Sequence, residues 1–488
     1  MKAYKIILVA LIPFVLGSFK NESTVIIKGK ILGKFPAKVA YTLNNSNTYN
    51  WVKADSAKTD SLGNFRIKIN SEKVAFIKLS ASVEAQAMLI IEPKGRYEVQ
   101  FDLNKNKDYF QVLKGNADAQ NLYNKSTLPM DPELVQVDAQ KLYRDTSATS
   151  IREKIAKQKA ADVAPFKKLF DEGKISKDYF QLLLIDRDCY YATLQATVVW
   201  IKQLTISRSK KPLPDEMKNL WIETFQKPLF DVEKIGSTPW FYSYCQKYVY
   251  FKEFINNDTN PDNTNSQYTT YFINEARKYL PKHLLESFVA NQIYLKSIDK
   301  QYENELVKLY TQFKKDYPIS NYTKYIKPEI DENIRFHQVA KTEFSNKIKF
   351  VDNYQNINTL KEAVEFAKGK KVYIDVWATW CHSCREEFVY RKELSKLLEA
   401  KGITMLYISV DRDEKDKQWK DLAKFYNLEG YHIRVNKNLY ADLSRIYNWH
   451  GSISIPWYII IDENGNILKE HAKSPAEIKE LEKELSSN

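Results

Sequence analysis

The sequence predicts three structural classes in succession: a small β-sandwich, an all-α region and a C-terminal α/β domain in which helices flank a mixed sheet. Three observations support this prediction. β-Branched and aromatic residues alternate with polar ones early in the chain, apolar residues recur at helical spacing in the middle, and apolar runs alternate with helical patterns at the end. The predicted domains are residues 24–116, 117–339 and 349–488.

The chain begins with a segment that is typical of a secretory signal. Basic residues precede an apolar run over residues 6–16, and the small residues Gly17 and Ser18 follow it. The run is too short to span a bilayer as a mature helix, and no later segment approaches that length. We therefore expect residues 1–18 to be a signal peptide and the mature protein to be soluble in the periplasm or cell envelope. A buried first strand is the alternative interpretation.

The composition is that of a folded protein with several domains. A chain of 488 residues with 44% hydrophobic content can form several cores. The formal net charge is +13, but the lysines are spread among Glu and Asp instead of forming one tract. This distribution favours a solvated basic surface, and no nucleic-acid partner is expected.

The first predicted domain shows the period of a half-buried sheet. Residues 24–31 and 65–69 alternate in polarity, and turn residues at 60–64 and 92–96 separate such runs. The spacing predicts a small antiparallel sandwich. This part has no cluster of His and carboxylates, no glycine-rich loop and no cysteine, so it carries no predicted chemistry.

The middle region is predicted to be helical. Residues 180–201 and 284–310 carry apolar side chains at helical spacing with Lys and Glu between them. Its many tyrosines could line a groove, but aromatic residues at this spacing are more often core residues. Cys189 and Cys245 lie here, and the sequence is equally compatible with one structural disulfide and with two buried thiols.

The last part has the pattern of an α/β unit. The predicted strands are 371–376, 403–410, 457–461 and 466–469, and the predicted helices are 381–400, 416–426, 439–447 and 475–485. Gly402 ends the first helix, and residues 462–465 form a hairpin turn between the last two strands. Parallel strands with crossover helices, followed by a hairpin, predict a mixed sheet covered on both faces.

A Cys-x-x-Cys pair lies between the first of these strands and its helix. The N–H groups of a helix start favour the thiolate of Cys381, and Cys384 lies one turn on, where it can resolve a mixed disulfide. A structural zinc site needs four ligands, and the sequence has no second such pair to complete one. We therefore predict a redox-active dithiol with no metal and no cofactor.

The C-terminal part resembles the thioredoxin fold, and within it the envelope thiol-disulfide oxidoreductases related to TlpA and ResA. The motifs that carry the resemblance are Trp377-Ala378-Thr379-Trp380-Cys381-x-x-Cys384-Arg385-x-Glu387, Ile408-Ser409-Val410-Asp411, and Tyr447-Asn448-Trp449-His450-Gly451 leading to Ile455-Pro456. The upstream parts resemble, less specifically, the β-rich and helical extension found before many envelope thioredoxin domains. We therefore expect a thioredoxin-like C-terminal domain.

The resemblance implies roles for five residues. Cys381 matches the exposed attacking thiol and Cys384 the buried resolving thiol. Pro456 matches a cis-proline that faces the dithiol, and Ile455 would offer backbone hydrogen bonds to a substrate strand. Asp375 stands where thioredoxin carries a buried acid, and such a carboxyl has a raised pKa and can accept the proton of the resolving thiol. An acid that faces solvent at a strand end is the alternative.

Other positions bear on substrate contact and on the direction of electron flow. Trp380, beside the nucleophile, is expected to touch substrate. Ser383 stands where proline is common, and His382 either stabilises the thiolate when protonated or points to solvent; both interpretations stay open. Trp457 replaces a common threonine after the cis-proline, so the substrate groove is expected to differ in shape. Val389 replaces a proline, which removes an expected helix kink.

The sequence therefore predicts an exported oxidoreductase that reduces protein disulfides. By resemblance, its partners are disulfide-containing client proteins and a membrane thiol electron donor. The extensions could form a homo-oligomer interface or a client platform. One alternative is an isomerase or oxidase on the same fold. The other is a binding or scaffold protein that carries a redox-sensitive thioredoxin appendage.

Overall fold

The computed structural model describes residues 23–44, 55–82, 84–126, 128, 132–207, 211–232, 235–257, 267–447 and 453–486. The predicted signal peptide and the Trp449-His450-Gly451 motif lie outside these residues. The chain divides into two compact units, residues 1–260 and 261–488. This division falls inside the predicted helical region, and the domain boundaries proposed from the sequence stay a prediction.

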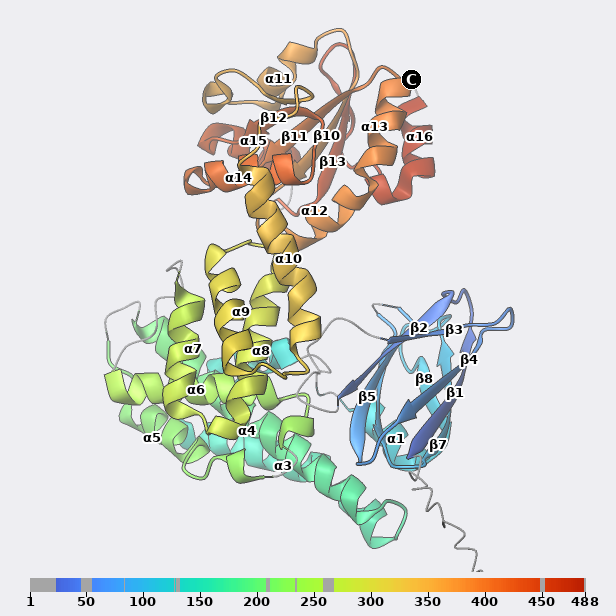
Figure 1. Ribbon diagram of the computed structural model, residues 1–488, viewed down its shortest axis with the longest axis vertical. Helices are drawn as coiled ribbons and strands as arrows, with labels where there is room; N and C mark the ends of the chain where they lie inside the picture. The colour runs from blue at the N-terminus through green and yellow to red at the C-terminus, as the bar shows by residue number, and fades with distance from the viewer. Residues whose placement is uncertain are drawn as a thin grey trace, which may run out of the picture. The chain divides into compact units, whose positions relative to one another are not determined.

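The first unit begins with a sandwich of two four-stranded sheets (Figure 1). One sheet has the order β4-β1-β7-β8 and the other β3-β2-β5-β6. The strands are β1 (Thr24–Leu32), β2 (Lys38–Asn44), β3 (Asp55–Lys58), β4 (Asn64–Asn70), β5 (Ala75–Ser80), β6 (Gln86–Ile91), β7 (Arg96–Asp102) and β8 (Phe110–Lys114). Side chains from both sheets, including Ile27, Leu79 and Phe101, form one buried core.

One strand pair corrects the predicted antiparallel arrangement. β1 pairs with β4 antiparallel but with β7 parallel. The two parallel neighbours are far apart along the chain, and the strands of the other sheet lie between them in sequence. A hairpin therefore does not constrain their direction.

Among the described residues, the α-helices that complete the first unit are α1 (Ala117–Asn124), α2 (Val135–Tyr143), α3 (Ala148–Asp171), α4 (Lys177–Ser207), α5 (Asp215–Thr224) and α6 (Phe241–Asn257). The amide of Gln120 on α1 exchanges two hydrogen bonds with the backbone of Ile90, at 3.1 and 2.7 Å. α1 thus covers the otherwise open edge of β6. Cys189 on α4 and Cys245 on α6 are both buried free thiols, so of the two arrangements left open the structure has the unpaired one.

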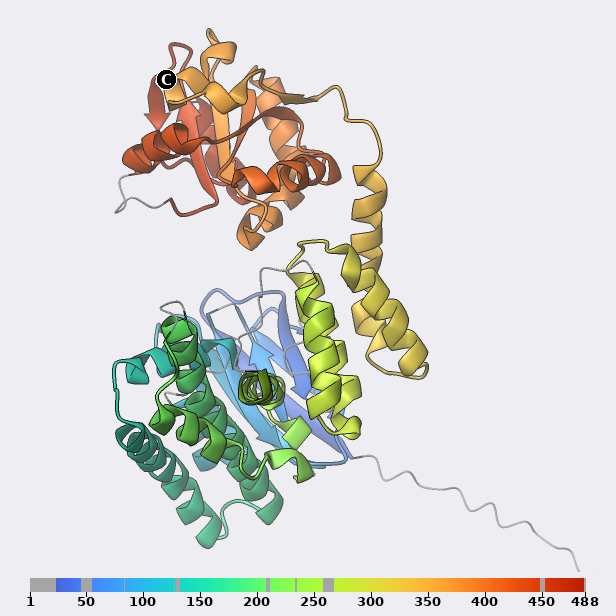
Figure 2. The same ribbon diagram turned by 90° about the vertical axis from the view of Figure 1, so that its left-hand side faces the viewer.

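In the second unit, the described residues begin at 267 and form the helices α7 (Tyr268–Tyr279), α8 (Lys282–Ile298), α9 (Asn304–Asp316) and α10 (Thr323–Ala340) (Figure 2). Their apolar residues recur at helical spacing and are buried. On α9 these residues are Leu306, Leu309, Tyr310 and Phe313. This spacing is the pattern from which the all-α region was predicted.

The second unit ends in a mixed six-stranded sheet of order β14-β13-β10-β11-β12-β9. The strands are β9 (Ile348–Phe350), β10 (Val372–Trp377), β11 (Thr404–Ser409), β12 (Gly430–Arg434), β13 (Trp457–Ile461) and β14 (Ile467–Lys469). β10, β11, β12 and β9 are parallel, and β13 runs antiparallel to both of its neighbours. This arrangement confirms the predicted sheet and adds β9 and β12, two short strands that the sequence analysis missed.

The helices of this domain are α11 (Leu360–Ala363), α12 (His382–Glu387), α13 (Arg391–Ala400), α14 (Asp416–Phe425), α15 (Lys437–Tyr447) and α16 (Ile478–Ser486). The single helix predicted over 381–400 is wrong, because a 3₁₀ turn at Phe388–Tyr390 separates α12 from α13. The helix is therefore interrupted there although no proline is present. The ring of Phe388 is buried, and its centroid lies 5.2 Å from the ring centroids of both Trp377 and Tyr426. This packing holds the turn against the core.

Among the residues described, no helix combines the length and the apolar composition that crossing a membrane requires.

Candidate active site

The dithiol lies where β10 ends and α12 begins. Cys381 and Cys384 form a disulfide with a Cα–Cα distance of 5.3 Å. Cys381 is the N-cap of α12, and its sulfur accepts a hydrogen bond of 3.1 Å from the backbone N–H of Cys384. The pair thus sits at a helix start, as predicted. An N–H directed at this sulfur would stabilise a thiolate once the disulfide is reduced.

The resemblance implies that Cys381 is exposed, whereas this residue is buried in the disulfide form. Cys381 is 4% exposed and Cys384 is 1% exposed, so both residues are buried. The sulfur of Cys381 lies against the helix start, where the backbone N–H of Cys384 donates to it. The structure therefore shows the oxidised state of the dithiol with little of either sulfur open to solvent.

Pro456 enters the site from the neighbouring strand. The Ile455–Pro456 peptide bond is cis, as the resemblance implies. Pro456 immediately precedes β13, and β13 pairs antiparallel with β10 so that Trp457 lies opposite Val376. The proline is thereby placed at the same end of the sheet as the dithiol. The indole N–H of Trp457 donates to the carbonyl oxygen of Glu470 at 2.6 Å, so this side chain is held within the fold.

Asp375 lies inside the domain, two residues before the end of β10. It is 2% exposed, and Tyr407 and Tyr458 are its register partners on the two adjacent strands. Burial raises the pKa of its carboxyl well above the usual value, and the negative charge of Glu387 raises it further. Its Oδ1 atom has no hydrogen-bond partner among the described residues. The interpretation as a solvent-facing acid is therefore wrong, whereas the catalytic role stays a prediction.

Glu387 is a second acid near the site to which the sequence analysis assigned no role. It is half-buried on α12, and its carboxylate accepts a hydrogen bond of 3.0 Å from the backbone N–H of Ala476. The available signal was its place in the Cys384-Arg385-x-Glu387 motif, where helical spacing brings residues three apart onto one face.

A buried carboxylate fixes the loop in front of the dithiol. Asp411 accepts hydrogen bonds from the backbone N–H and the hydroxyl of Thr379, at 2.8 and 2.7 Å. The hydroxyl of Ser409 donates to the same carboxylate at 2.8 Å. The Ile408–Asp411 motif therefore has a structural task, which is to hold the segment that carries Trp380.

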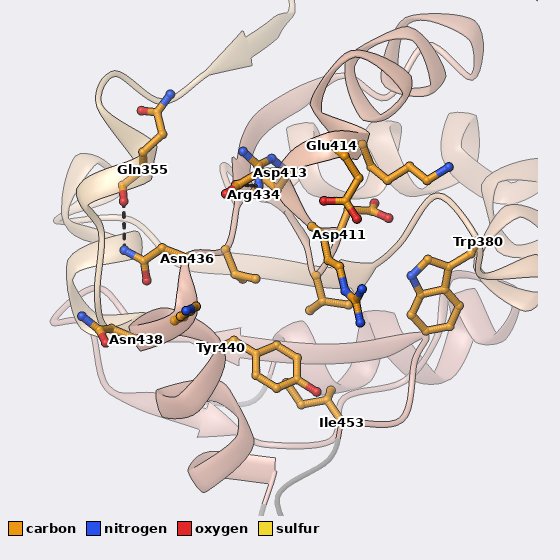
Figure 3. A pocket seen from close by; sticks show the side chains of 15 residues that line it. Gln355, Trp380, Asp411, Asp413, Glu414, Arg434, Asn436, Asn438, Tyr440 and Ile453 are labelled. Carbon is orange, nitrogen blue, oxygen red and sulfur yellow. Dashed lines mark hydrogen bonds and ion pairs between the residues drawn. The ribbon is translucent and has the colours of Figure 1, made fainter. Parts of the chain in front are cut away.

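Trp380, which directly precedes Cys381, borders an open groove of about 1540 Å³ (Figure 3). Its indole is 58% exposed. Across the groove lie Tyr440 and Ile453, and the remaining lining side chains are mainly polar or charged: Gln355, Val410, Asp411, Arg412, Asp413, Glu414, Lys415, Arg434, Val435, Asn436, Lys437 and Asn438. Trp380 is thus open to solvent at the border of this groove.

The two residues between the cysteines face outward. His382 is 64% exposed, and its Nε2 atom lies 3.5 Å from the Glu386 carboxylate one turn along α12. The hydroxyl of Ser383 lies 3.5 Å from the sulfur of Cys381. Of the two interpretations left open for His382, the observed orientation matches the solvent-facing one. In the part of the chain described, no group of His, Cys, Asp or Glu could hold a metal ion.

Comparison with known proteins places these features in the last third of the chain. A profile of the Redoxin family matches residues 345–485. The thiol-disulfide oxidoreductase ResA of Bacillus thuringiensis subsp. konkukian is 32% identical over 103 residues, which are 21% of this chain and 55% of the relative. The chain thus spans about half the length of that relative.

Two further matches have broader coverage of the other protein. The thioredoxin-like protein YneN of Bacillus subtilis is 32% identical over 125 residues, which are 26% of this chain and 69% of the relative. Among solved structures, the thioredoxin domain of a thiol-disulfide oxidoreductase from Bacteroides vulgatus is 25% identical, with a TM-score of 0.21; the match covers 24% of this chain and 81% of that one.

Proposed function

Because the chain belongs to the thioredoxin-like thiol-disulfide oxidoreductases, we propose that it is an exported enzyme that reduces protein disulfides through Cys381 and Cys384. The observation that carries the proposal is the Cys381–Cys384 disulfide at the start of α12. A buried acid on the strand before it and a cis-proline immediately before the adjacent strand support the same chemistry.

The proposed reaction begins from the reduced dithiol. The Cys381 thiolate attacks one sulfur of a client disulfide and forms a mixed disulfide, while the other client sulfur leaves as a thiolate that takes a proton from water. Cys384 then loses its proton to the Asp375 carboxylate and attacks the sulfur of Cys381. The second client thiol departs, and the disulfide seen in the structure remains. Two electrons pass from the enzyme dithiol to the client.

Asp375 suits the second step for an electrostatic reason. Its raised pKa means that the carboxylate, once formed, is a stronger base than an exposed aspartate. The released proton is thereby held in an apolar site until it can leave. The role assigned to Asp375 is proton acceptor for Cys384.

The groove beside Trp380 is the proposed seat of the client polypeptide. Its mixture of aromatic, amide and charged side chains suits an extended, polar peptide segment, and the backbone of Ile455 lies next to the cis-proline to bind it. Disulfide-containing client proteins and a membrane thiol that re-reduces the enzyme are the partners this function requires. We place the enzyme in the periplasm on the strength of its N-terminal sequence.

The test is the reduction potential of the dithiol in a glutathione buffer. A value of about −270 mV supports a reductase, whereas one of about −120 mV shows an oxidant and overturns the proposed direction. Cys381→Ser should abolish insulin reduction, and Cys384→Ser should accumulate a mixed disulfide with the client. Cys189 and Cys245 need no replacement, because burial raises the pKa of both thiols and keeps them unreactive.

A further inference from the structure

We propose that the loop joining α8 to α9, residues 299–303, positions the active-site segment through Arg385, so that the helices before the thioredoxin-like domain tune the reduction potential of the dithiol. The inference rests on the proposed function in taking Cys381 and Cys384 as an exchanging pair. The loop and the active-site segment both lie within the unit 261–488. Arg385 is here a positioning residue.

The guanidinium of Arg385 connects the α8–α9 loop to the active-site segment. It directly follows Cys384 and is 6% exposed. One terminal nitrogen donates to the carbonyl oxygen of Thr379, two residues before Cys381. The other donates to the carbonyl oxygen of Asp299 at 2.8 Å. Asp299 is the C-cap of α8, so the guanidinium occupies the negative end of that helix dipole.

The loop that supplies this carbonyl is held in a costly backbone conformation. Lys300 and Tyr302 have φ angles of 52° and 54°, in the left-handed region that side chains other than Gly, Asn and Asp rarely adopt. Such conformations persist where surrounding contacts fix them. The loop is therefore shaped by its neighbours and not by its own preference.

α10 provides the contacts that fix the loop. Glu332 accepts hydrogen bonds from the Lys300 ammonium at 2.8 Å and from the Tyr302 hydroxyl at 2.7 Å. The ring of Tyr302 stacks on Phe336 with centroids 4.4 Å apart. His337 lies 2.7 Å from the carbonyl oxygen of Tyr302. None of these contacts involves the active-site segment.

The loop also contacts the thioredoxin-like domain beyond Arg385. The hydroxyls of Tyr302 and Tyr426 lie 2.9 Å apart, and Tyr426 packs on Phe388 behind the dithiol helix. The side chain of Gln418 donates to the carbonyl oxygen of Gln301 at 3.1 Å. These contacts bind the domain to the loop on the side of α14.

A second cation supplies a natural control. Lys424 on α14 donates to the carbonyl oxygens of Ala340 and Thr342, at 3.0 and 2.7 Å, and so caps the end of α10. Figure 1 shows α10 ending beside α14. Lys424 thus fastens α10 to the same domain, and among the described residues no hydrogen bond joins it to the segment that carries the dithiol.

Holding Arg385 beside the dithiol should favour the thiolate of the reduced form, because a fixed positive charge stabilises it. Arg385→Gln should therefore increase the disulfide-to-dithiol ratio in a fixed glutathione buffer, by about tenfold. Glu332→Gln, which only loosens the loop, should shift the ratio in the same direction by about threefold. The double variant should shift it no further than Arg385→Gln alone, and Lys424→Gln should leave it unchanged.

The measurement uses the full-length protein and follows the ratio by alkylation and mass spectrometry, with the pH profile of Cys381 alkylation as a second readout. An effect of Glu332→Gln that adds to that of Arg385→Gln, no effect of Glu332→Gln, or an equal effect of Lys424→Gln would each overturn the inference. If Arg385→Gln does not fold, the comparison of Glu332→Gln with Lys424→Gln still decides. Absence of insulin reduction by the wild type would defeat the proposed function but not the coupling.

Discussion

The carboxyl group of Asp375 is almost completely buried, and its burial should make the free energy of unfolding depend on pH. Its folded-state pKa is raised above the unfolded value, so the folded protein binds the extra proton and loses stability as pH rises through the interval between the two pKa values. Asp375→Asn should remove this loss, by about 1.4 kcal/mol for each pH unit of that interval. Urea unfolding at pH 5 and pH 8 measures this loss; a variant whose unfolding free energy falls between the two pH values as much as that of the wild type contradicts the prediction.

The same substitution should impair turnover. The amide that replaces the carboxylate in Asp375→Asn cannot accept the proton of Cys384, so the resolving step should slow about a hundredfold, which is the usual contribution of general base catalysis. Single-turnover reduction of a mixed disulfide measures this step. Attack by Cys381 should proceed at the wild-type rate, which serves as the internal control. If resolution kept its wild-type rate in the variant, Asp375 would not be the proton acceptor.

His382 should matter little, in contrast to Asp375. The imidazole is 64% exposed, and its contact with Glu386 is a surface pair on a helix. Such pairs contribute about 0–1 kcal/mol, and their fields are screened by salt. His382→Ala should therefore shift the glutathione equilibrium less than about fivefold. A larger shift at an ionic strength of about 0.15 M would show that the histidine acts on the thiolate.

At the scale of elements, the 3₁₀ turn between α12 and α13 predicts that a proline substitution is tolerated there better than inside a helix. Val389 is 69% exposed within the 3₁₀ turn, so Val389→Pro should cost less than about 1 kcal/mol of unfolding free energy. The matched control is Lys396→Pro, at an exposed site inside α13, which should cost about 3 kcal/mol. Urea denaturation compares the two. Equal costs would mean that the turn behaves as continuous helix.

At the scale of the whole molecule, the division at residue 260 predicts an autonomous C-terminal unit. A fragment of residues 261–488 should fold and keep the glutathione equilibrium of the full chain. A fragment of residues 343–488 leaves Arg385 and Lys424 without their helix ends, and each lost set of hydrogen bonds should cost about 1–3 kcal/mol. Thermal melts of both fragments test this, and equal stability would contradict it.

Much of the site was predictable because it depends on short-range spacing. The Cys-x-x-Cys pair after an apolar strand predicted both the disulfide and the helix start that holds it. Gly402 ends α13 with a φ of 65°, and residues 462–465 turn the chain between β13 and β14. The resemblance to thioredoxin implied a buried acid at Asp375, and every residue of β10 is buried. In each case the information lies within a few residues along the chain.

The sequence alone determined the three structural classes, the mixed sheet and the dithiol, since periodicity and local motifs specify each of them. Only the tertiary structure decided which segments meet. The bond from Arg385 to Asp299 joins positions 86 residues apart, and the parallel pairing of β1 with β7 joins strands with no direct connection. Such contacts depend on how complete elements pack, because a guanidinium can cap any free helix end that packing brings within reach.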